Sequence, residues 1–356
     1  MRLHPILQIL LAPLSLLYGI GVLLNDLLYR LDVLRPTRFG VPTICVGNLT
    51  MGGSGKSPHV EYIVDFLRPY ISVGTLSRGY KRKTRGFQLA HEASTPEDIG
   101  DEPLAYRRKF ANVMVAVGEN RTFAIMYMVQ HQPDLQCIVL DDAFQHRAVQ
   151  AGLNLLLTEY NLPFTRDYLL PSGRLREWRT GYQRANIIVV TKCPSQLADN
   201  KRLKLIQELN PYPQQRVYFS YYKYGAPYRL MFPSFTSQLT TGVDVLVICA
   251  IANSNYLTDY LKTKVNSIKI LEFADHHFFV REDIGLLKRS YNEMSGRNKI
   301  VITTEKDAIR LEQHYGLLNE YQLPMFVLPV QVAFHGDGEA ERFQDDIADY
   351  LLAVRR

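Results

Sequence analysis

The sequence predicts an α/β protein built on a mostly parallel, doubly wound sheet, with a second, smaller α/β unit after it. Short apolar runs recur after residue 40, and helical stretches separate most of them. Strands that are buried on both faces read as continuous apolar runs, and parallel strands need crossover helices, so this alternation indicates helices on both faces of a parallel sheet. The length of 356 residues and the 47% apolar fraction are typical of a folded chain with about two domains.

The expected strands fall into two sets, which predict two units. Their ranges are 42–48, 70–76, 112–118, 136–142, 153–159 and 186–192, and then 244–252, 267–273 and 299–305. Segments 216–230 and 324–334 are expected to connect the two units as strands, because aromatic and β-branched residues favour extended structure. The expected organisation is an N-terminal hydrophobic helix with a basic flank, a large domain, a smaller domain and a C-terminal helix, over residues 1–38, 39–220, 221–335 and 336–356.

Residues 5–24 form an uncharged apolar stretch that would reach about 30 Å as a helix, the thickness of bilayer hydrocarbon. A secretory signal, a buried core helix and a membrane-associated helix are the three alternatives. No small-residue cleavage site follows, and the nearby Arg30, Arg35 and Arg38 suit anionic headgroups on the cytoplasmic side. We therefore favour a membrane-associated helix; Pro13 should kink it, and a spanning and an in-plane orientation both stay open.

Charge and cysteine content exclude several classes of protein. The net charge is +6, but the chain has no block of Lys and Arg and no nucleic-acid-binding motif, so no nucleic acid partner is expected. The four cysteines form no C-x-x-C pair and no zinc-ligand spacing. Three of them lie inside apolar runs, where a thiol behaves as a small core residue, and this pattern fits a reducing compartment.

A glycine-rich loop between an expected strand and an expected helix carries the strongest chemical signal. In ICVGNLTMGGSGKSPHVEYIV (44–64), backbone N–H groups and the helix N-terminus can surround phosphate oxygens, while Lys56 reaches the terminal phosphates and Ser57 binds Mg²⁺. Thr50 stands where the usual pattern has glycine, so Gly52 and Gly53 are expected to supply the turn. The expected nucleotide-binding residues are Thr50, Met51, Gly52, Gly53, Ser54, Gly55, Lys56 and Ser57.

Two adjacent carboxylates, Asp141 and Asp142, end the expected strand at 136–142. Ligands of parallel sheets bind beyond the carboxyl ends of the strands, so these side chains are expected to face the phosphate loop and hold Mg²⁺; an aspartate pair that only caps a helix is the alternative. Gln145 and His146 follow and could line the same crevice. The strings TKCP and TEKD do not match the guanine-reading pattern N/T-K-x-D, so ATP is the expected nucleotide.

The motifs together resemble the lipid A 4′-kinase (tetraacyldisaccharide 4′-kinase) family over nearly the whole chain. They are VGNLTMGGSGKSP (46–58), LSRGYKRK (76–83), GDEP (100–103), LDDAFQHR (140–147), LLPSGRLRE (169–177), VVTK (189–192), FADHH (273–277) and TEKDAIR (304–310). The resemblance implies a P-loop kinase core with the nucleotide bound between it and the smaller domain. It also implies transfer of the ATP γ-phosphate to the 4′-hydroxyl of a tetraacyl glucosamine disaccharide 1-phosphate in lipid A biosynthesis.

The resemblance also implies roles for individual residues. Asp101 in GDEP is expected to take or orient the sugar hydroxyl proton, paired with His276, with His277 as the second choice. From the residues alone, a helix cap is the favoured interpretation of Asp101 and a loop histidine that of His276; only the resemblance reverses this. Lys56 completes the catalytic set. The expected metal ligands are Ser57, Asp141, Asp142 and Glu177, and the candidates for substrate binding are Arg78, Arg82, Arg121, Gln145, His146 and His277.

The expected cofactors are ATP and Mg²⁺, and the expected partners are the lipid disaccharide 1-phosphate and the cytoplasmic face of the inner membrane. The protein is expected to be peripheral or anchored through its N-terminus, with a cytoplasmic catalytic body, and to act as a monomer. A membrane-associated P-loop ATPase or switch module that has no lipid acceptor is the alternative function. It differs in one observable property, which is ATP hydrolysis without added lipid.

Overall fold

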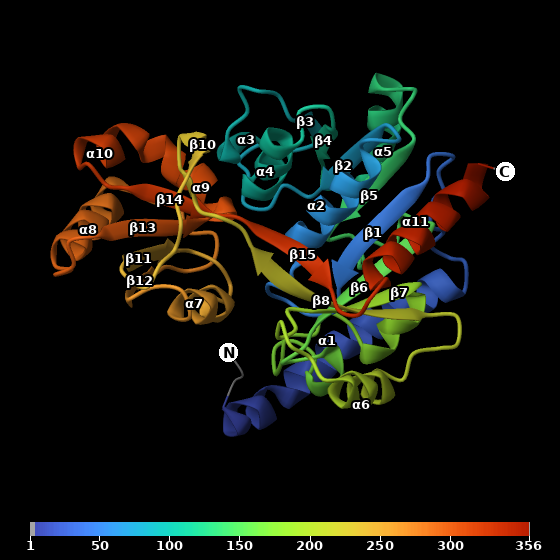
Figure 1. The fold of residues 1–356 in the computed structure, drawn as a ribbon. Helices are drawn as coiled ribbons and strands as arrows, with labels where there is room; N and C mark the ends of the chain where they lie inside the picture. Colours follow the sequence, from blue (N-terminus) through green and yellow to red (C-terminus); the bar gives the residue numbers. More distant parts are fainter. Residues whose placement is uncertain (1–3, 356) are drawn as a thin grey trace.

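A computed structural model describes residues 4–355, which form two sheets with helices packed on them (Figure 1). The larger sheet has nine strands in the order β15-β8-β7-β6-β1-β5-β2-β4-β3. Strands β8 to β4 of this order run parallel, while β15 and β3 pair antiparallel at the two edges. Their bounds are β1 Thr43–Asn48, β2 Val73–Ser77, β3 Gln88–Leu89, β4 Met114–Val117, β5 Cys137–Asp141, β6 Leu153–Glu159, β7 Ile187–Thr191, β8 Arg216–Tyr224 and β15 Val330–Phe334.

Helices cover both faces of the larger sheet, as the apolar strands require. One face packs against α2 (Lys56–Leu67), α4 (Asp101–Lys109) and α11 (Glu339–Arg355). The other face packs against α5 (Arg121–His131) and α6 (Asp199–Leu209). Short helices at Pro96–Ile99 (α3), Phe164–Arg166 and Arg179–Arg184 lie in the connections. The predicted α/β class with a mostly parallel, doubly wound sheet is therefore confirmed.

The smaller sheet has six strands in the order β10-β9-β14-β13-β11-β12, with β14 to β12 parallel. Segments 216–230 and 324–334 each run from one sheet into the other, and β8 pairs with β15 where they cross (Figure 1). The strands are β9 Tyr228–Arg229, β10 Phe232–Thr236, β11 Asp244–Cys249, β12 Ser267–Glu272, β13 Lys299–Thr304 and β14 Met325–Leu328; the helices are α7 Asn255–Lys262, α8 Arg281–Asn292, α9 Glu305–Leu311 and α10 Tyr315–Glu320, with a 3₁₀ turn at Glu312–His314.

A second contact joins the two sheet units beside the site described below. Ile309 of α9 packs against Ile99, Leu104 and Val117 of the larger unit. At the C-terminal end of α4, Lys109 lies 3.5 Å from Glu305, the first residue of α9, so the two units also make a charged contact. Helix α9 of the smaller unit is therefore held against α4 of the larger one.

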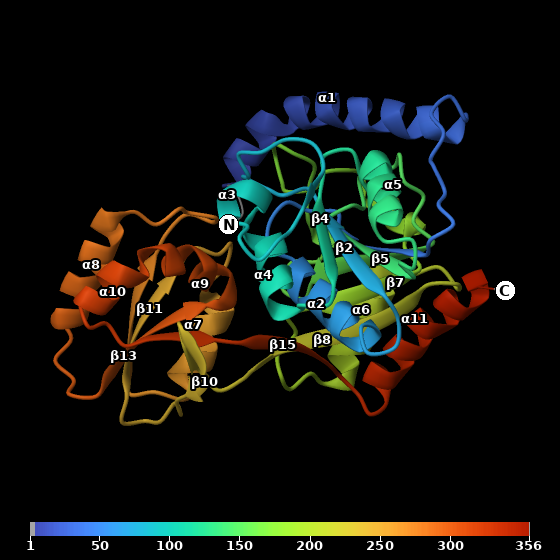
Figure 2. The ribbon, with the colours of Figure 1, turned by 90° about the horizontal axis from the view of Figure 1, so that it is seen from above.

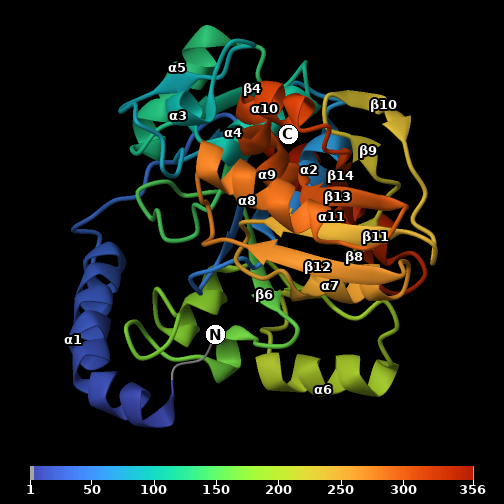
Figure 3. The same cartoon turned by 90° about the vertical axis from the view of Figure 1, so that its left-hand side faces the viewer.

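The N-terminal helix α1 (Pro5–Arg30) lies along one side of the larger unit (Figures 2 and 3). Only Ser15 and Gly19 in it are buried. Ser15 Oγ donates to Leu169 O at 3.1 Å, and Trp178 Nε1 donates to Gly19 O at 2.9 Å. The helix continues through Pro13 and exposes most of its leucine and isoleucine side chains. This exposure differs from that of a core helix, and length and composition allow α1 to cross a membrane.

Candidate active site

The glycine-rich loop joins β1, in the middle of the larger sheet, to α2. Two of its glycines need a left-handed backbone, Gly52 with φ +103° and Gly55 with φ +87°, and Gly55 immediately precedes the helix. Met51 N donates to Arg174 O at 2.6 Å, which fixes the outer side of the loop. Lys56 Nζ lies 3.3 Å from Asn48 Oδ1, so its ammonium folds back over the loop. The eight predicted nucleotide-binding residues thus run without a break from the loop into the first turn of α2.

Asp141 and Asp142 end β5, the neighbour of β1, and they have different environments. Asp142 Oδ1 accepts a hydrogen bond from Arg176 Nη2 at 2.7 Å, and Asp142 Oδ2 lies 3.6 Å from Lys56 Nζ. Burial raises the pKa of Asp142, but the charges of Lys56 and Arg176 outweigh burial, so the pKa is lowered. Asp141 Oδ2 accepts from the Tyr106 hydroxyl at 2.9 Å. Its Oδ1 is buried and has no hydrogen-bond partner within residues 4–355. Burial, with the charges of Glu102 and Asp142, raises the pKa of Asp141 to about 7.

Ser57 and Glu102 lie on the same side of the loop as Asp141. Ser57 Oγ donates to Glu102 Oε1 at 2.9 Å, and the charge of Glu102 acts on Asp141. Glu102 is absent from the sequence prediction, although its position beside Asp101 in the first turn of α4 is a signal that could have found it. An unpaired buried carboxylate oxygen, a second carboxylate and a hydroxyl are suitable donors for Mg²⁺, which prefers oxygen.

Glu177 occupies a different position from the other three predicted metal ligands. It accepts from Gln145 Nε2 at 2.8 Å and pairs with Arg184 at 2.7 Å, so both of its oxygens face cationic or amide groups. In the described part of the chain, no three His, Cys, Asp or Glu side chains cluster as a ready-made metal cage. This is consistent with Mg²⁺ chemistry, where one or two carboxylates act together with substrate phosphates.

Asp101 and His276 meet across the two sheet units, 175 positions apart in sequence. His276 Nδ1 lies 3.0 Å from Asp101 Oδ2, and its Nε2 lies 2.9 Å from Lys306 Nζ. The ammonium can only donate, so Nε2 accepts and Nδ1 carries the hydrogen that Asp101 receives. Burial raises the pKa of Asp101, but the hydrogen bond from His276 and the charges of Lys306 and Arg310 outweigh it and lower the pKa to about 2. His276 has φ +60°, a conformation that costs backbone energy.

His277 points away from this pair. Its Nε2 lies 2.7 Å from Asp283 Oδ2, and its ring stacks on Phe273 at 4.8 Å between centroids. The structure therefore places His276, and not its neighbour, against Asp101. Lys306 is absent from the prediction, although TEKDAIR contains it. It lies 3.5 Å from Glu102, so the Asp101–His276 pair and the Ser57–Glu102 pair belong to one network.

Arg121 and His146 each have a buried side-chain nitrogen that makes no hydrogen bond within the described residues. Arg121 is 3% exposed and donates to Gly118 O, but its Nε, like His146 Nε2, is buried with no hydrogen-bond partner in the region the structure describes. Burial, with the charges of Arg121 and Arg78, lowers the pKa of His146. Glu119 holds one end of the Arg82 guanidinium at 2.6 Å, but Arg82 Nε and Nη1 are also buried without a hydrogen-bond partner among the described residues. The unused N–H of the buried Arg121 guanidinium is a suitable donor for an anionic group.

Known proteins resemble this chain over nearly its whole length. The family model described as tetraacyldisaccharide-1-P 4′-kinase matches residues 7–351. The chain belongs to this family. It is 40% identical over 353 residues to the tetraacyldisaccharide 4′-kinase of Bacteroides thetaiotaomicron, covering 96% of this chain and 92% of that protein. It is 42% identical over 336 residues to the enzyme of the same name from Porphyromonas gingivalis, covering 92% and 93%.

A solved structure extends the likeness to the fold. A crystal structure of LpxK from Aquifex aeolicus in complex with ATP has a TM-score of 0.73 and 25% identity, covering 97% of this chain and 99% of that chain. The predictions of the family and of kinase activity are therefore confirmed.

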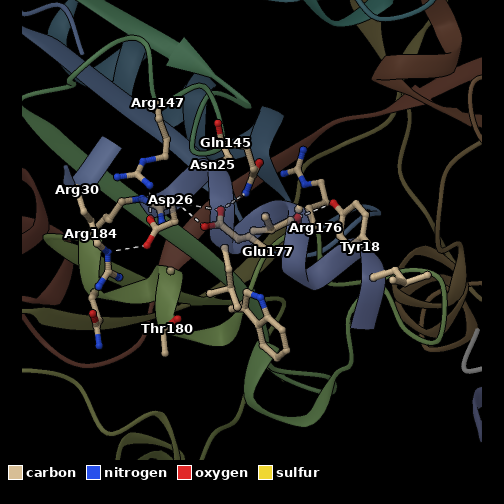
Figure 4. Close-up of a pocket in the computed structure, with 17 residues that line it drawn as sticks. Tyr18, Asn25, Asp26, Arg30, Gln145, Arg147, Arg176, Glu177, Thr180 and Arg184 are labelled. Carbon is tan, nitrogen blue, oxygen red and sulfur yellow. Dashed lines mark hydrogen bonds and ion pairs between the residues drawn. The ribbon is translucent and has the colours of Figure 1, made fainter. Parts of the chain in front are cut away.

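In this kinase a cavity of about 490 Å³ separates α1 from the body of the larger unit (Figure 4). At its border the Tyr18 hydroxyl of α1 donates to Arg176 O at 2.6 Å, and Asp26 of α1 pairs with Arg147. Gln145 borders both the cavity and the phosphate loop, since its Nε2 donates to Asn48 O at 2.7 Å. A ligand in the cavity would therefore lie next to the end of β1.

Proposed function

We propose that this kinase transfers the γ-phosphate of ATP to the 4′-hydroxyl of a tetraacyl glucosamine disaccharide 1-phosphate at the cytoplasmic face of the inner membrane. The observation that carries the proposal is the Asp101–His276 pair, which the Lys306–Glu102–Ser57 contacts connect to the start of α2. A nucleotide switch needs a phosphate loop and a metal. It does not need a buried carboxylate–imidazole pair to which a second sheet unit contributes the histidine.

The phosphate loop is the proposed ATP site. Its amides and the N-terminus of α2 would surround the terminal phosphates, and Lys56 would neutralise their charge. Ser57 and Asp141 would hold Mg²⁺, with Glu102 beside them and Asp142 held back by Arg176 and Lys56. When bound there, Mg²⁺ would neutralise charge between the β- and γ-phosphates. The unpaired oxygen of Asp141 and its raised pKa support this assignment. A cation bound there would fill the free oxygen's coordination and stabilise the ionised carboxylate.

Asp101 would orient the acceptor hydroxyl, and His276 would hold Asp101. A carboxylate whose pKa is lowered to about 2 is a weak base but a good hydrogen-bond acceptor. Phosphoryl transfer passes through a loose transition state, which requires an aligned acceptor oxygen more than early proton removal. The weak basicity therefore fits the proposed role. His276 comes from the smaller unit, so the contact between the two units is what completes the pair.

The lipid substrate would reach the site from the side of α1. The exposed side chains Ile9 (73%) and Leu10 (69%) on this helix have no apolar cover in residues 4–355, and a bilayer surface would provide one. Arg121 and His146 would bind anionic parts of the substrates, and the cavity beside α1 would take part of the lipid headgroup. We propose a peripheral or N-terminally anchored monomer on this basis.

Incubation with γ-labelled ATP and tetraacyl disaccharide 1-phosphate in mixed micelles tests the proposal. Label should enter the lipid, and ATP should be consumed only when lipid is present. His276→Gln should lose most of this activity, whereas His277→Gln, a matched change at the adjacent residue, should keep it. Rapid ATP hydrolysis that is independent of lipid would support the switch alternative and contradict the proposal.

A further inference from the structure

Three consecutive carbonyl groups of the phosphate loop each accept a hydrogen bond from a buried side chain. Lys192 Nζ donates to Gly53 O, and Thr191 Oγ1 donates to Ser54 O at 2.8 Å. His59 Nδ1 lies 2.7 Å from Gly55 O and must carry the hydrogen, since a carbonyl can only accept. The three donors are Thr191 (0% exposed), His59 (1%) and Lys192 (7%). We name this set the carbonyl clamp.

The clamp donors come from outside the loop and are themselves held. Thr191 ends β7, which is separated from β1 by β6, and Lys192 follows it with φ +57°. The Lys192 ammonium also bonds Glu159 Oε1 at 2.6 Å, at the end of β6. His59 Nε2 lies 2.9 Å from Ser220 Oγ on β8. The ends of β6 and β7 and the middle of β8 are thereby tied to one turn.

These features are costly for the fold. A buried ammonium loses its hydration, and a lysine in the left-handed region loses backbone energy. Strained or desolvated residues of this kind persist where the surrounding structure holds them in place, and they are concentrated at functional sites. The VVTK run at residues 189–192, which belongs to the family resemblance but has no role in it, supplies two of the three donors.

The clamp determines which groups of the loop face a bound phosphate. In a trans peptide the carbonyl oxygen and the following N–H point in opposite directions. Holding Ser54 O and Gly55 O on the side of the clamp therefore turns the N–H groups of Gly55 and Lys56 to the other side. Lys192 holds the preceding peptide unit, whose Ser54 N–H closes the turn onto Gly52 O at 3.0 Å. Three partially negative oxygens are thus kept away from the place where phosphate would sit.

We propose that Thr191, Lys192 and His59 are positioning residues that hold the phosphate loop in its nucleotide-binding conformation before ATP arrives. The inference rests on the proposed ATP site, but it does not depend on which lipid accepts the phosphate. A loop that is already ordered loses less conformational entropy when ATP binds. Loss of the clamp therefore weakens the affinity for ATP and leaves the chemical step nearly intact.

Steady-state kinetics of Thr191→Val tests the clamp with little change in volume. The KM for ATP should rise about tenfold, which corresponds to about 1.4 kcal/mol, while kcat at saturating ATP changes less than about twofold and the KM for lipid stays the same. Thr158→Val is the matched control, because it also removes a buried hydroxyl at a strand end, one that accepts from Phe164 N instead of contacting the loop. It should lower the melting temperature without changing the KM for ATP.

A second pair of variants uses chemical rescue. His59→Leu removes the donor, whereas the amide of His59→Asn can place an N–H near the position of Nδ1. The KM for ATP should rise about tenfold or more in the first variant and about threefold or less in the second. Equal KM values for both, or a Thr191→Val enzyme that is less stable but has the wild-type KM, would overturn the proposal.

The dissociation constant of Mg-ATP, measured without lipid by the shift in melting temperature, separates this proposal from the proposed function. If the wild-type protein binds ATP but does not phosphorylate the disaccharide, the acceptor assignment fails and the clamp can still be tested. If Thr191→Val and His59→Leu bind Mg-ATP as tightly as wild type, the clamp is wrong whatever the acceptor.

Discussion

Replacing Asp141 with asparagine should stabilise the metal-free protein at alkaline pH and abolish phosphotransfer. The pKa of Asp141 is raised from an ordinary 3.8 to about 7. An acid whose pKa is raised by folding carries no penalty below its ordinary pKa; stability is lost as the pH rises from there toward 7, and the loss is complete above 7. At pH 8 the ionised carboxylate therefore destabilises the metal-free fold, and a neutral side chain removes this cost.

The change in unfolding free energy at pH 8 follows from the pKa shift of Asp141 and from the hydrogen bonds that asparagine can make. A rise of about three pH units at about 1.4 kcal/mol each gives about 4 kcal/mol. The asparagine oxygen can still accept from Tyr106, but its NH₂ group replaces an oxygen that has no partner in residues 4–355, which costs about 1–3 kcal/mol. The net gain at pH 8 is about 2 kcal/mol. For a chain of this length that corresponds to about 3 °C in melting temperature.

Scanning calorimetry in EDTA at pH 5 and pH 8 measures this effect. The gain should be near zero at pH 5 and full at pH 8, and added MgCl₂ should raise the melting temperature of wild type but not of the variant. Asp142→Asn is the control, because Lys56 and Arg176 lower the pKa of Asp142 and its neutralisation should destabilise the protein at pH 8. An Asp141→Asn protein that is no more stable than wild type at pH 8 would refute the reasoning.

Asp101→Asn should lower kcat by about 10²–10⁴ and leave the dissociation constant of Mg-ATP unchanged, as single-turnover and thermal-shift assays can show; an unchanged kcat would remove Asp101 from the mechanism. Lys306→Met should lower kcat about tenfold, because His276 Nε2 loses its donor, and a wild-type kcat would make that contact incidental. A Cβ atom on Gly19 would lie 2.5 Å from Trp178, whereas one on Gly21 would meet nothing within 4 Å. Gly19→Ala should therefore displace α1 and raise the KM for lipid severalfold but not the KM for ATP, and Gly21→Ala should raise neither.

Local signals in the sequence were sufficient for the phosphate loop and for the larger sheet. The left-handed backbone at Gly52 and Gly55, the adjacent helix start and the strand before it all lie within about 20 residues. The acidic pair after β5 was also predictable, because the carboxyl ends of parallel strands share one edge of the sheet. The turn and each strand end are local properties of the chain, and the shared edge of a parallel sheet brings them together.

Contacts between distant segments could not be read in the same way. FADHH offers two adjacent histidines, and only packing of the smaller unit against α4 places His276 at Asp101 and turns His277 to Asp283. Glu177 was expected as a metal ligand from the family resemblance, yet Arg184 and Gln145 hold it beside the cavity. The family resemblance supplied the expectation for His276, but composition and spacing did not.

The sequence by itself determined the backbone turn that can receive a phosphate, because glycine placement and helix initiation are local properties. The tertiary structure alone decided what surrounds that turn: the Glu102 carboxylate at Ser57, the Lys306 ammonium at His276, and the three donors behind the loop. These charges and hydrogen bonds acquire their strength from burial, and burial is a property of the whole packed chain.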